Sequence, residues 1–308
     1  MTSPSISIGV TDRSVRRNGV DVAGLVFAGA LLLALLFSLA VLGVLIWSQM
    51  ATALPVFQER GLDFLTSDLS SNPANAGIAQ GLIGTALLVV IVALTAFPIG
   101  IMTAIFLEEY SADNRLARLI DINIRNLAGV PSVVYGILGF TVFVALFANF
   151  GDSNGKTVVT GGLTLAVLIL PLVIITSAEA IRAVPNLLRE GGYGLGASRW
   201  QVVRQLILPA AAPGILTGTV LSLSRAIGET APLILVGAVL GSFSSGGSPL
   251  ELITGSYTAL PMIIFSWASR PQQEFRALTS AAIIVLLVVT VVTNAFAILL
   301  RNRYDRSW

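Results

Sequence analysis

The chain has 308 residues, of which 55% are hydrophobic and 11% are charged, whereas soluble domains carry roughly 25% charged residues. A soluble protein of this length could not bury so much apolar surface, so the sequence predicts an integral membrane protein. The formal net charge is only +2, and the chain contains neither cysteine nor histidine. These features exclude thiol catalysis, disulfide bonds and metal sites built on those side chains. The lack of a polar domain with a basic face excludes binding to nucleic acid.

Six apolar runs are each long enough to cross the hydrocarbon core of a bilayer, which takes about 20 helical residues. They lie at about 23–47, 77–107, 127–149, 160–180, 213–241 and 277–300. Because the runs do not alternate in polarity, they exclude a β-barrel and predict an all-α bundle of six transmembrane helices. The first run exceeds the roughly 7–15 apolar residues of a signal peptide, so we expect it to be an uncleaved anchor.

The polar segments between these runs define the predicted organisation of the chain. Residues 1–21 form a polar tail, and residues 22–76 hold the first transmembrane helix and an outer loop. Residues 77–300 form the transmembrane core, within which residues 182–212 are the longest inward-facing loop. Residues 301–308 form a second tail.

The orientation follows from the positions of lysine and arginine, which are enriched in cytoplasmic loops. With the N-terminus in the cytoplasm, thirteen of these residues lie inside and four outside, and Arg225 lies within the membrane. We therefore predict that both termini are cytoplasmic. On the same side, Glu108 and Glu109 are expected to be solvated charges at the end of the second helix.

Three pairs of glycines stand four residues apart in or near the predicted spans. They are Gly77 and Gly81, Gly214 and Gly218, and Gly237 and Gly241. Such pairs let helix backbones approach closely in lipid, although glycine is also simply common in membrane helices. Each pair is therefore a candidate helix contact.

The loop at 182–212 mixes apolar and charged residues between prolines. Pro185 is expected to break the chain near the start of the loop, and Pro209 and Pro213 near its end. The pattern between them predicts two short amphipathic helices joined around glycines. Such helices either dock a partner protein or lie on the bilayer surface.

Two charges, Arg225 and Glu229, interrupt the fifth run near the expected midplane of the bilayer. An arginine there costs about 2.5–3.5 kcal/mol on insertion scales. The spacing of four puts both side chains on one face of a continuous helix, and Thr219 and Ser222 extend that face. This polar stripe should face the bundle interior or an aqueous path. The alternative is an ion pair that only locks two helices together.

A fixed guanidinium suits a solute site, because its planar donors bind oxyanions such as phosphate in a bidentate manner. The carboxylate of Glu229 then has two possible roles. It either orients Arg225 or accepts a hydrogen bond from a protonated oxyanion. Phosphate keeps a proton near neutral pH and sulfate does not, so the second role favours phosphate.

The loop also carries a family resemblance. Glu190-Gly-Gly-x-x-x-Gly196, followed by Ile207-Leu208-Pro209, resembles the EAA loop of ABC-importer permeases. The resemblance implies a coupling helix that docks a cytoplasmic ATPase, with Glu190 and Gly196 in the conserved positions. Gly191 and Gly192 replace two alanines of that motif, which should loosen the helix by about 1 kcal/mol per site.

The charged stretch sharpens the resemblance. Arg225-Ala-Ile-Gly-Glu229-Thr230-Ala-Pro resembles the signature of phosphate ABC-transporter permeases of the PstA type, and so does Glu179-Ala-Ile-Arg182-Ala-Val-Pro185. The likeness covers about residues 77–300. It implies a type I importer permease of the bacterial cytoplasmic membrane, with a phosphate pathway at Arg225, Glu229, Ser222, Thr230 and Arg182. Arg182 is alternatively an ordinary basic residue at a helix end.

The resemblance also implies partners: a sister permease, an ATPase dimer that holds ATP and Mg²⁺, and an extracytoplasmic phosphate-binding protein. The chain itself has no Walker A sequence and no catalytic constellation, so it is not expected to be an enzyme or to bind a cofactor. Three alternatives remain: a permease for sulfate or molybdate, a secondary transporter driven by an ion gradient, and a structural membrane subunit.

Overall fold

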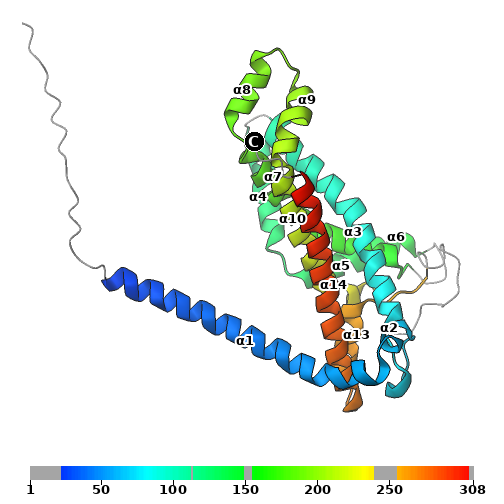
Figure 1. Cartoon of the computed structure of the whole chain (residues 1–308). Helices are drawn as coiled ribbons and strands as arrows, with labels where there is room; N and C mark the ends of the chain where they lie inside the picture. Colours follow the sequence, from blue (N-terminus) through cyan, green and yellow to red (C-terminus); the bar gives the residue numbers. More distant parts are fainter. Residues whose placement is uncertain (1–21, 112–113, 149–154, 239–254, 305–308) are drawn as a thin grey trace, which may run out of the picture. The chain divides into compact units, whose positions relative to one another are not determined.

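The computed structural model describes residues 22–111, 114–148, 155–238 and 255–304 (Figure 1). Every regular element in these ranges is helical, which confirms the predicted all-α fold. Five helices are long and apolar enough to cross a membrane, and six if one bent pair is counted as a single span. The predicted tail at 1–21 and the last four residues lie outside the described ranges.

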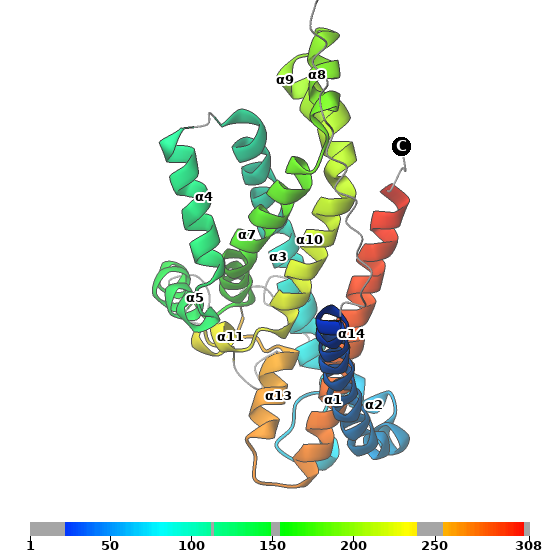
Figure 2. The same ribbon diagram turned by 90° about the vertical axis from the view of Figure 1, so that its left-hand side faces the viewer.

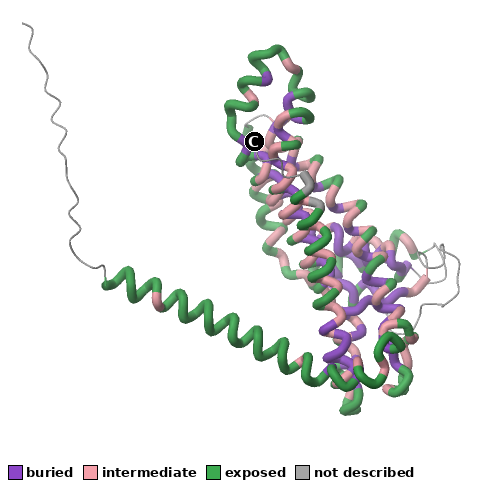
Figure 3. Tube along the Cα trace, viewed as in Figure 1, coloured by how far each residue is buried: buried purple, intermediate pink, exposed green. Residues whose placement is uncertain are grey.

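The chain divides into two compact units, residues 1–48 and 49–308. Helix α1 (Val22–Arg60) begins in the first unit and continues well beyond the predicted end at residue 47. Apolar side chains in the described part of the first unit are exposed, including Leu33 and Phe37, and Figure 3 colours nearly all of this stretch as exposed. An apolar helix of this length suits a bilayer, where lipid covers such side chains.

The second unit is built on four long helices. They are α3 (Ala79–Ile105), which a π-helical turn η2 (Phe106–Tyr110) extends, α7 (Val158–Arg182), α10 (Leu208–Gly228) and α14 (Glu274–Tyr304). Helix α3 packs on α7, α7 on α10, and α10 on α14 (Figure 2). These helices confirm the second, fourth and sixth predicted spans and the first part of the fifth.

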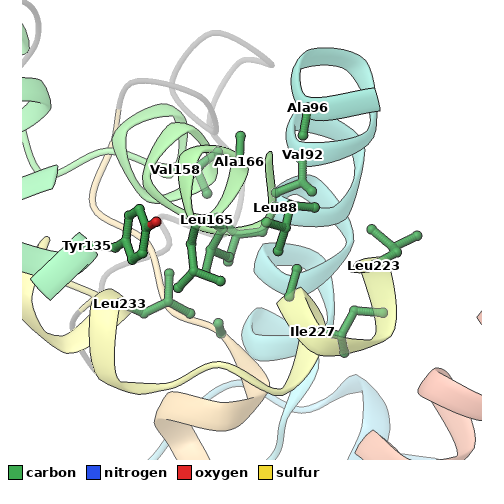
Figure 4. Packing of buried hydrophobic residues seen from close by; sticks show 14 of the residues in the cluster. Leu88, Val92, Ala96, Tyr135, Val158, Leu165, Ala166, Leu223, Ile227 and Leu233 are labelled. Atoms are coloured by element: carbon green, nitrogen blue, oxygen red, sulfur yellow. The ribbon is translucent and has the colours of Figure 1, made fainter. Parts of the chain in front are cut away.

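The core of this unit lies where α3, α7 and α10 meet. Leu88 on α3, Leu165 on α7 and Leu223 on α10 belong to one buried cluster (Figure 4). A second cluster joins the end of α1 to the helices α2 (Asp63–Thr66) and α13 (Leu260–Ala268) and to α14, and it includes the fully buried Trp267.

The glycine pair on α10 is a helix contact, as predicted. A Cβ atom on Gly214 would lie 2.7 Å from the Cβ of Ala180, and one on Gly218 would lie 2.3 Å from Oγ1 of Thr176. Both neighbours belong to α7, so the two backbones approach closely along this line. The order of the contacts also shows that α7 and α10 run antiparallel.

Of the other two pairs, Gly77 and Gly81 do not form a single helix contact. Gly81 lies on α3 against Ile263 of α13, whereas Gly77 precedes the helix and lies against the backbone of Ser67. Gly237 has φ of +89°, and its partner Gly241 is outside the described residues. The spacing of four alone therefore did not identify helix interfaces.

The third predicted span, at about 127–149, corresponds to a bent pair of helices that counts as one span and begins earlier, at residue 115. Helix α4 (Arg115–Ala128) ends at Gly129, and the helical stretch from α5 (Ser132–Leu138) through η3 (Gly139–Val144) and α6 (Ala145–Phe147) is bent by 104° relative to it. Pro131 explains the break, because its ring disfavours a helical conformation in the preceding residue and it has no N–H to continue the helix.

The prediction of a continuous fifth helix at 213–241 is wrong. Helix α10 ends at Gly228, and Glu229 is extended with φ −79° and ψ 118°. A short helix, α11 (Ala231–Leu235), follows with Pro232 in its first turn, and residues 239–241 are not described. The fixed φ of proline suits the start of a helix, so a new helix begins here and α10 does not continue.

Helices α5 and α11, which follow the two breaks, pack against each other. In Figure 2, α5 lies beside α11. A Cβ atom on Gly136 of α5 would lie 2.8 Å from Cα of Pro232. The two breaks, at 129–131 and 229–230, therefore belong to one region of the second unit in which the helices are interrupted.

The loop at 182–212 contains one separate helix, α8 (Asn186–Gly194), with Pro185 at its N-cap. The second predicted amphipathic helix is not separate, because α9 (Arg199–Val202) and the π-turn η4 (Val203–Ile207) run directly into α10. Pro209 and Pro213 therefore do not break the chain. The π-turn accommodates the backbone bond that Pro209 cannot make.

Candidate functional site

Arg225 and Glu229 meet at the C-terminal end of α10. Arg225 is in the last turn of the helix, and its Nε donates to Oε1 of Glu229 at 3.3 Å. The side chain of Arg225 is 46% exposed and that of Glu229 is 18% exposed. Among the described residues, Nη1 and Nη2 of Arg225 have no hydrogen-bond partner. Glu229 thus holds the guanidinium of Arg225 through Nε, and Nη1 and Nη2 remain available as hydrogen-bond donors.

The end of a helix is a favourable place for this cation. The carbonyl groups of the last turn carry partial negative charge, which stabilises a guanidinium there. Glu229 adds a full negative charge just beyond the helix. These two effects offset part of the cost of an arginine in an apolar span, and neither depends on a continuous helix.

The first part of the predicted polar stripe, Thr219 and Ser222, faces the bundle interior, which is one of the two orientations that the sequence predicted. Ser222 is fully buried and donates to the carbonyl of Gly218 at 2.8 Å, and Thr219 is buried and donates to that of Leu216 at 2.9 Å. Ser222 lies four residues from Gly218, on the face of α10 that packs on α7. Its hydroxyl is therefore used within the helix and is not presented beside Arg225.

Two further residues lie at this break. Thr230 is partly buried, and its carbonyl accepts from the N–H of Ile234 at 3.1 Å. Tyr135 on α5, which the sequence did not single out, is within electrostatic reach of Arg225 and donates to the carbonyl of Leu127 at 2.8 Å. Only the folded arrangement of α5 and α11 brings this phenol near the arginine.

Arg182 is at the opposite end of the α7–α10 pair. Because Ala180 lies against Gly214, Arg182 stands about 20 Å along the helix axes from Arg225, at about 1.5 Å per residue. Its Nε and Nη2 donate to the two carboxylate oxygens of Glu108 at 3.2 and 2.5 Å. The structure therefore does not bring Arg182 together with Arg225. It places Arg182 beside a polar cavity of about 310 Å³.

The residues of the predicted coupling motif lie on and after α8. Glu190 and Gly191 are exposed, and Gly192 is buried. Gly196 has φ of +79°, its N–H donates to the Tyr193 carbonyl at 2.9 Å, and the next N–H donates to the Gly192 carbonyl at 3.1 Å. This is a Schellman turn, which takes glycine at the residue with positive φ.

The two remaining motif residues lie in the long helical stretch. Ile207 is fully buried in the cluster at this end of the bundle, and Pro209 stands in the first turn of α10. The loop also exposes apolar side chains on α8, after it and on α9, with Leu187 80%, Leu195 91% and Trp200 56% exposed. Exposed apolar side chains outside the apolar spans are typical of surfaces that contact a partner or the bilayer.

The two glycines that depart from the alanine pattern differ in their surroundings. A Cβ atom on Gly191 has nothing within 4 Å, whereas one on Gly192 would lie 2.9 Å from both Val202 and Leu206. Gly191→Ala is therefore expected to stabilise α8 by about 1 kcal/mol. Gly192→Ala should stabilise α8 less than Gly191→Ala does, because Val202 and Leu206 must move to make room for the added methyl group. Amide hydrogen exchange of α8 measures both, and equal protection in the two variants contradicts the expectation.

Residues 96–306 match the family described as binding-protein-dependent transport system inner membrane component. The phosphate transport system permease protein PstA 1 of Mycobacterium tuberculosis (strain ATCC 25618 / H37Rv) is 34% identical over 225 residues, which cover 72% of this chain and 69% of that protein. PstA of Yersinia pestis is 31% identical over 226 residues, which cover 73% and 72%.

Solved structures share the fold. A bacterial alginate ABC transporter in complex with alginate pentasaccharide-bound periplasmic protein aligns over 92% of this chain and 97% of its own, with a TM-score of 0.63 and 18% identity. The inward-facing MetNI methionine ABC transporter aligns over 74% and 96%, with a TM-score of 0.59 and 16% identity. The family predicted from the sequence is confirmed: the chain belongs to the binding-protein-dependent transport system inner membrane components and is a permease subunit of an ABC importer.

Proposed function

We propose that the chain imports inorganic phosphate as one of two permease subunits of an ATP-driven transporter in a bacterial cytoplasmic membrane. The observation that carries the proposal is the Arg225–Glu229 pair at the break between α10 and α11. The names of the PstA relatives support the choice of phosphate. Thirteen of the basic residues fall on one side of the predicted topology, which supports cytoplasmic termini.

The open nitrogens of Arg225 suit an oxyanion. With Nε held by Glu229, Nη1 and Nη2 form the free edge of the guanidinium, and two parallel hydrogen bonds from one edge match two oxygens of phosphate. The break in the helix frees backbone groups beside the guanidinium, and polar backbone is tolerated in a membrane where it lines a cavity.

Energy for transport comes from partners. The exposed side chains of Leu187 on α8, Leu195 just after it and Trp200 on α9 suit a groove in a cytoplasmic ATPase that binds ATP and Mg²⁺. Closure of the ATPase dimer moves α8, and the helices of this chain and of a sister permease rock to open the pathway inward. A binding protein outside the membrane delivers the phosphate. The chain itself carries out no covalent step.

Competition uptake in cells that lack their own phosphate importers tests the choice of solute. Cells that express the whole transporter should take up labelled phosphate, and excess unlabelled phosphate should block this uptake. Excess sulfate or molybdate should leave it unchanged. Equal competition by sulfate or molybdate would identify a permease for another oxyanion.

The role of Glu229 is tested by Glu229→Gln, which keeps the shape of the side chain and removes its charge. If Glu229 accepts a hydrogen bond from protonated phosphate, the variant should lose at least about tenfold in phosphate uptake, because an amide is a weaker acceptor than a carboxylate. Its preference for phosphate over sulfate should fall as well. Undiminished and selective uptake would rule out the acceptor role.

A further inference from the structure

Three consecutive residues of η2 each contact an arginine of another element. They are Glu108, Glu109 and Tyr110. Glu108 pairs with Arg182 at the end of α7, and Glu109 pairs with Arg189 of α8. The guanidinium of Arg199, at the start of α9, lies 5.5 Å from the ring centre of Tyr110. The expectation that Glu108 and Glu109 are merely solvated is therefore wrong. We name these three residues the η2 seat.

The central pair of the seat is buried, although it lies beyond the apolar part of α3. The side chain of Glu109 is 5% exposed and that of Arg189 is 19% exposed. Nε and Nη2 of Arg189 donate to the same oxygen, Oε1 of Glu109, at 3.1 and 2.9 Å. Breaking such a pair by removing one partner leaves a buried charge without its counter-charge, which is strongly unfavourable.

Arg189 also binds the end of α7. Its Nη2 donates to the Ile181 carbonyl at 2.9 Å and its Nη1 to the Val184 carbonyl at 2.6 Å. These carbonyls are at the C-terminal end of α7, where helix groups need outside partners. One side chain of α8 thereby joins three elements: α8 itself, α3 through η2, and α7.

The rest of α8 has few attachments. Gly192 is its only buried residue and packs on Val202 and Leu206, and the Schellman turn joins it to α9. Arg189 and Glu109 therefore give α8 a direct ion-paired link to the extension of α3, besides its packing on α9 and η4. A buried ion pair with two hydrogen bonds resists separation, whereas a mobile surface side chain does not.

We propose that the η2 seat is the element that transmits movement of the coupling helix to α3, and that Glu109 and Arg189 are positioning residues for ATP-driven uptake. The inference rests on the proposed function. The π-helical turn fits this role, because such turns in α-helices are frequent at functional sites. In this chain three neighbouring side chains of the turn contact three different elements.

The test uses the purified complex of this chain with its sister permease and ATPase in proteoliposomes. Glu109→Gln removes the charge of the seat, and Glu109→Asp keeps it. Asp121→Asn is the matched control, because Asp121 forms an exposed ion pair with Arg125 at 3.0 Å on α4. Phosphate uptake and ATP hydrolysis are measured on the same vesicles, so that the ATP consumed per phosphate is known for each variant.

For Glu109→Gln we expect ATP hydrolysis within about twofold of the unmodified complex and at least about tenfold less uptake, because the seat no longer holds α8 against α3. Glu109→Asp should recover most of the coupling, and Asp121→Asn should behave as the unmodified complex. An unchanged ratio of ATP to phosphate in Glu109→Gln would overturn the proposal. Loss of both activities in parallel, with loss of subunits from the complex, would also overturn it, because the residue would then only support assembly.

Amide hydrogen exchange gives a second readout that does not depend on the solute. In the same complex, Glu109→Gln should speed exchange in α8 (Asn186–Gly194), whether or not phosphate is present, and Asp121→Asn should not. Unchanged exchange in α8 would contradict the seat. If the unmodified complex hydrolyses ATP but takes up no phosphate, the proposed function fails, and the exchange result still decides whether the seat holds the helix.

Discussion

Replacing Arg225 by lysine is expected to lower phosphate uptake by at least about tenfold, because lysine keeps the charge but has no planar pair of donors for two phosphate oxygens. Lysine also cannot donate to Glu229 and keep two nitrogens on one free edge. Assembly of the transporter should be unaffected, since the arginine side chain is 46% exposed in this chain. Initial rates of labelled phosphate uptake, normalised to the amount of assembled complex, measure the effect.

The matched control is Arg115→Lys, the same exchange at an exposed residue in the first turn of α4. This variant should transport at the normal rate. If Arg225→Lys also transports normally, the guanidinium is not part of the phosphate pathway. If it fails to assemble, the pair only locks helices together, which is the structural alternative to a solute site.

The second large effect is expected at Gly218. A leucine there would collide with Thr176, whose Oγ1 would lie 2.3 Å from even the first added carbon. Overpacking of this kind typically costs about 1–3 kcal/mol, and here it must separate α10 from α7. The purified permease should unfold at a temperature several degrees lower and lose uptake. Thermal unfolding in detergent, followed by tryptophan fluorescence, measures the change.

A second-site variant separates this contact from other effects of the substitution. Gly218→Ala should be milder than Gly218→Leu, and Thr176→Gly should relieve it, because Thr176 supplies the three nearest atoms. If Thr176→Gly gives no recovery, the Gly214–Gly218 line is not the point of closest approach. Independent, additive losses from the two substitutions would lead to the same conclusion.

Hydropathy predicted the number of spans well, because the length of an apolar run is set by the thickness of the bilayer. It did not predict where helices break inside an apolar run. Both breaks follow a glycine and precede a proline: Gly129 and Pro131 in one case, Gly228 and Pro232 in the other. Prolines alone are a poor guide, since Pro171 stands inside an unbroken α7.

The Arg225–Glu229 pair was predictable, because two charges in an apolar run are visible in any sequence. The burial of Ser222 was not predictable, because Gly214, Gly218 and their partners decide which face of α10 packs on α7. The helical period places Ser222 near Arg225 on α10, but packing buries one and exposes the other.

The η2 seat was invisible in the sequence for a different reason. Glu109 and Arg189 are separated by 80 positions, and nothing local distinguishes Glu109 from an ordinary charge at a helix end. Its burial depends on how α7 and α8 close over η2. Pairings between distant segments require the tertiary fold, whereas helix periods and breaks are local.

The most direct measurement is uptake of labelled phosphate by proteoliposomes that contain this chain with its sister permease and ATPase, supplied with a phosphate-loaded binding protein. We expect uptake that requires both ATP at the ATPase side and the binding protein. Uptake that continues without ATP or without the ATPase would contradict the proposed function and indicate a secondary transporter. ATP hydrolysis that the loaded binding protein stimulates, without entry of phosphate, would contradict it equally.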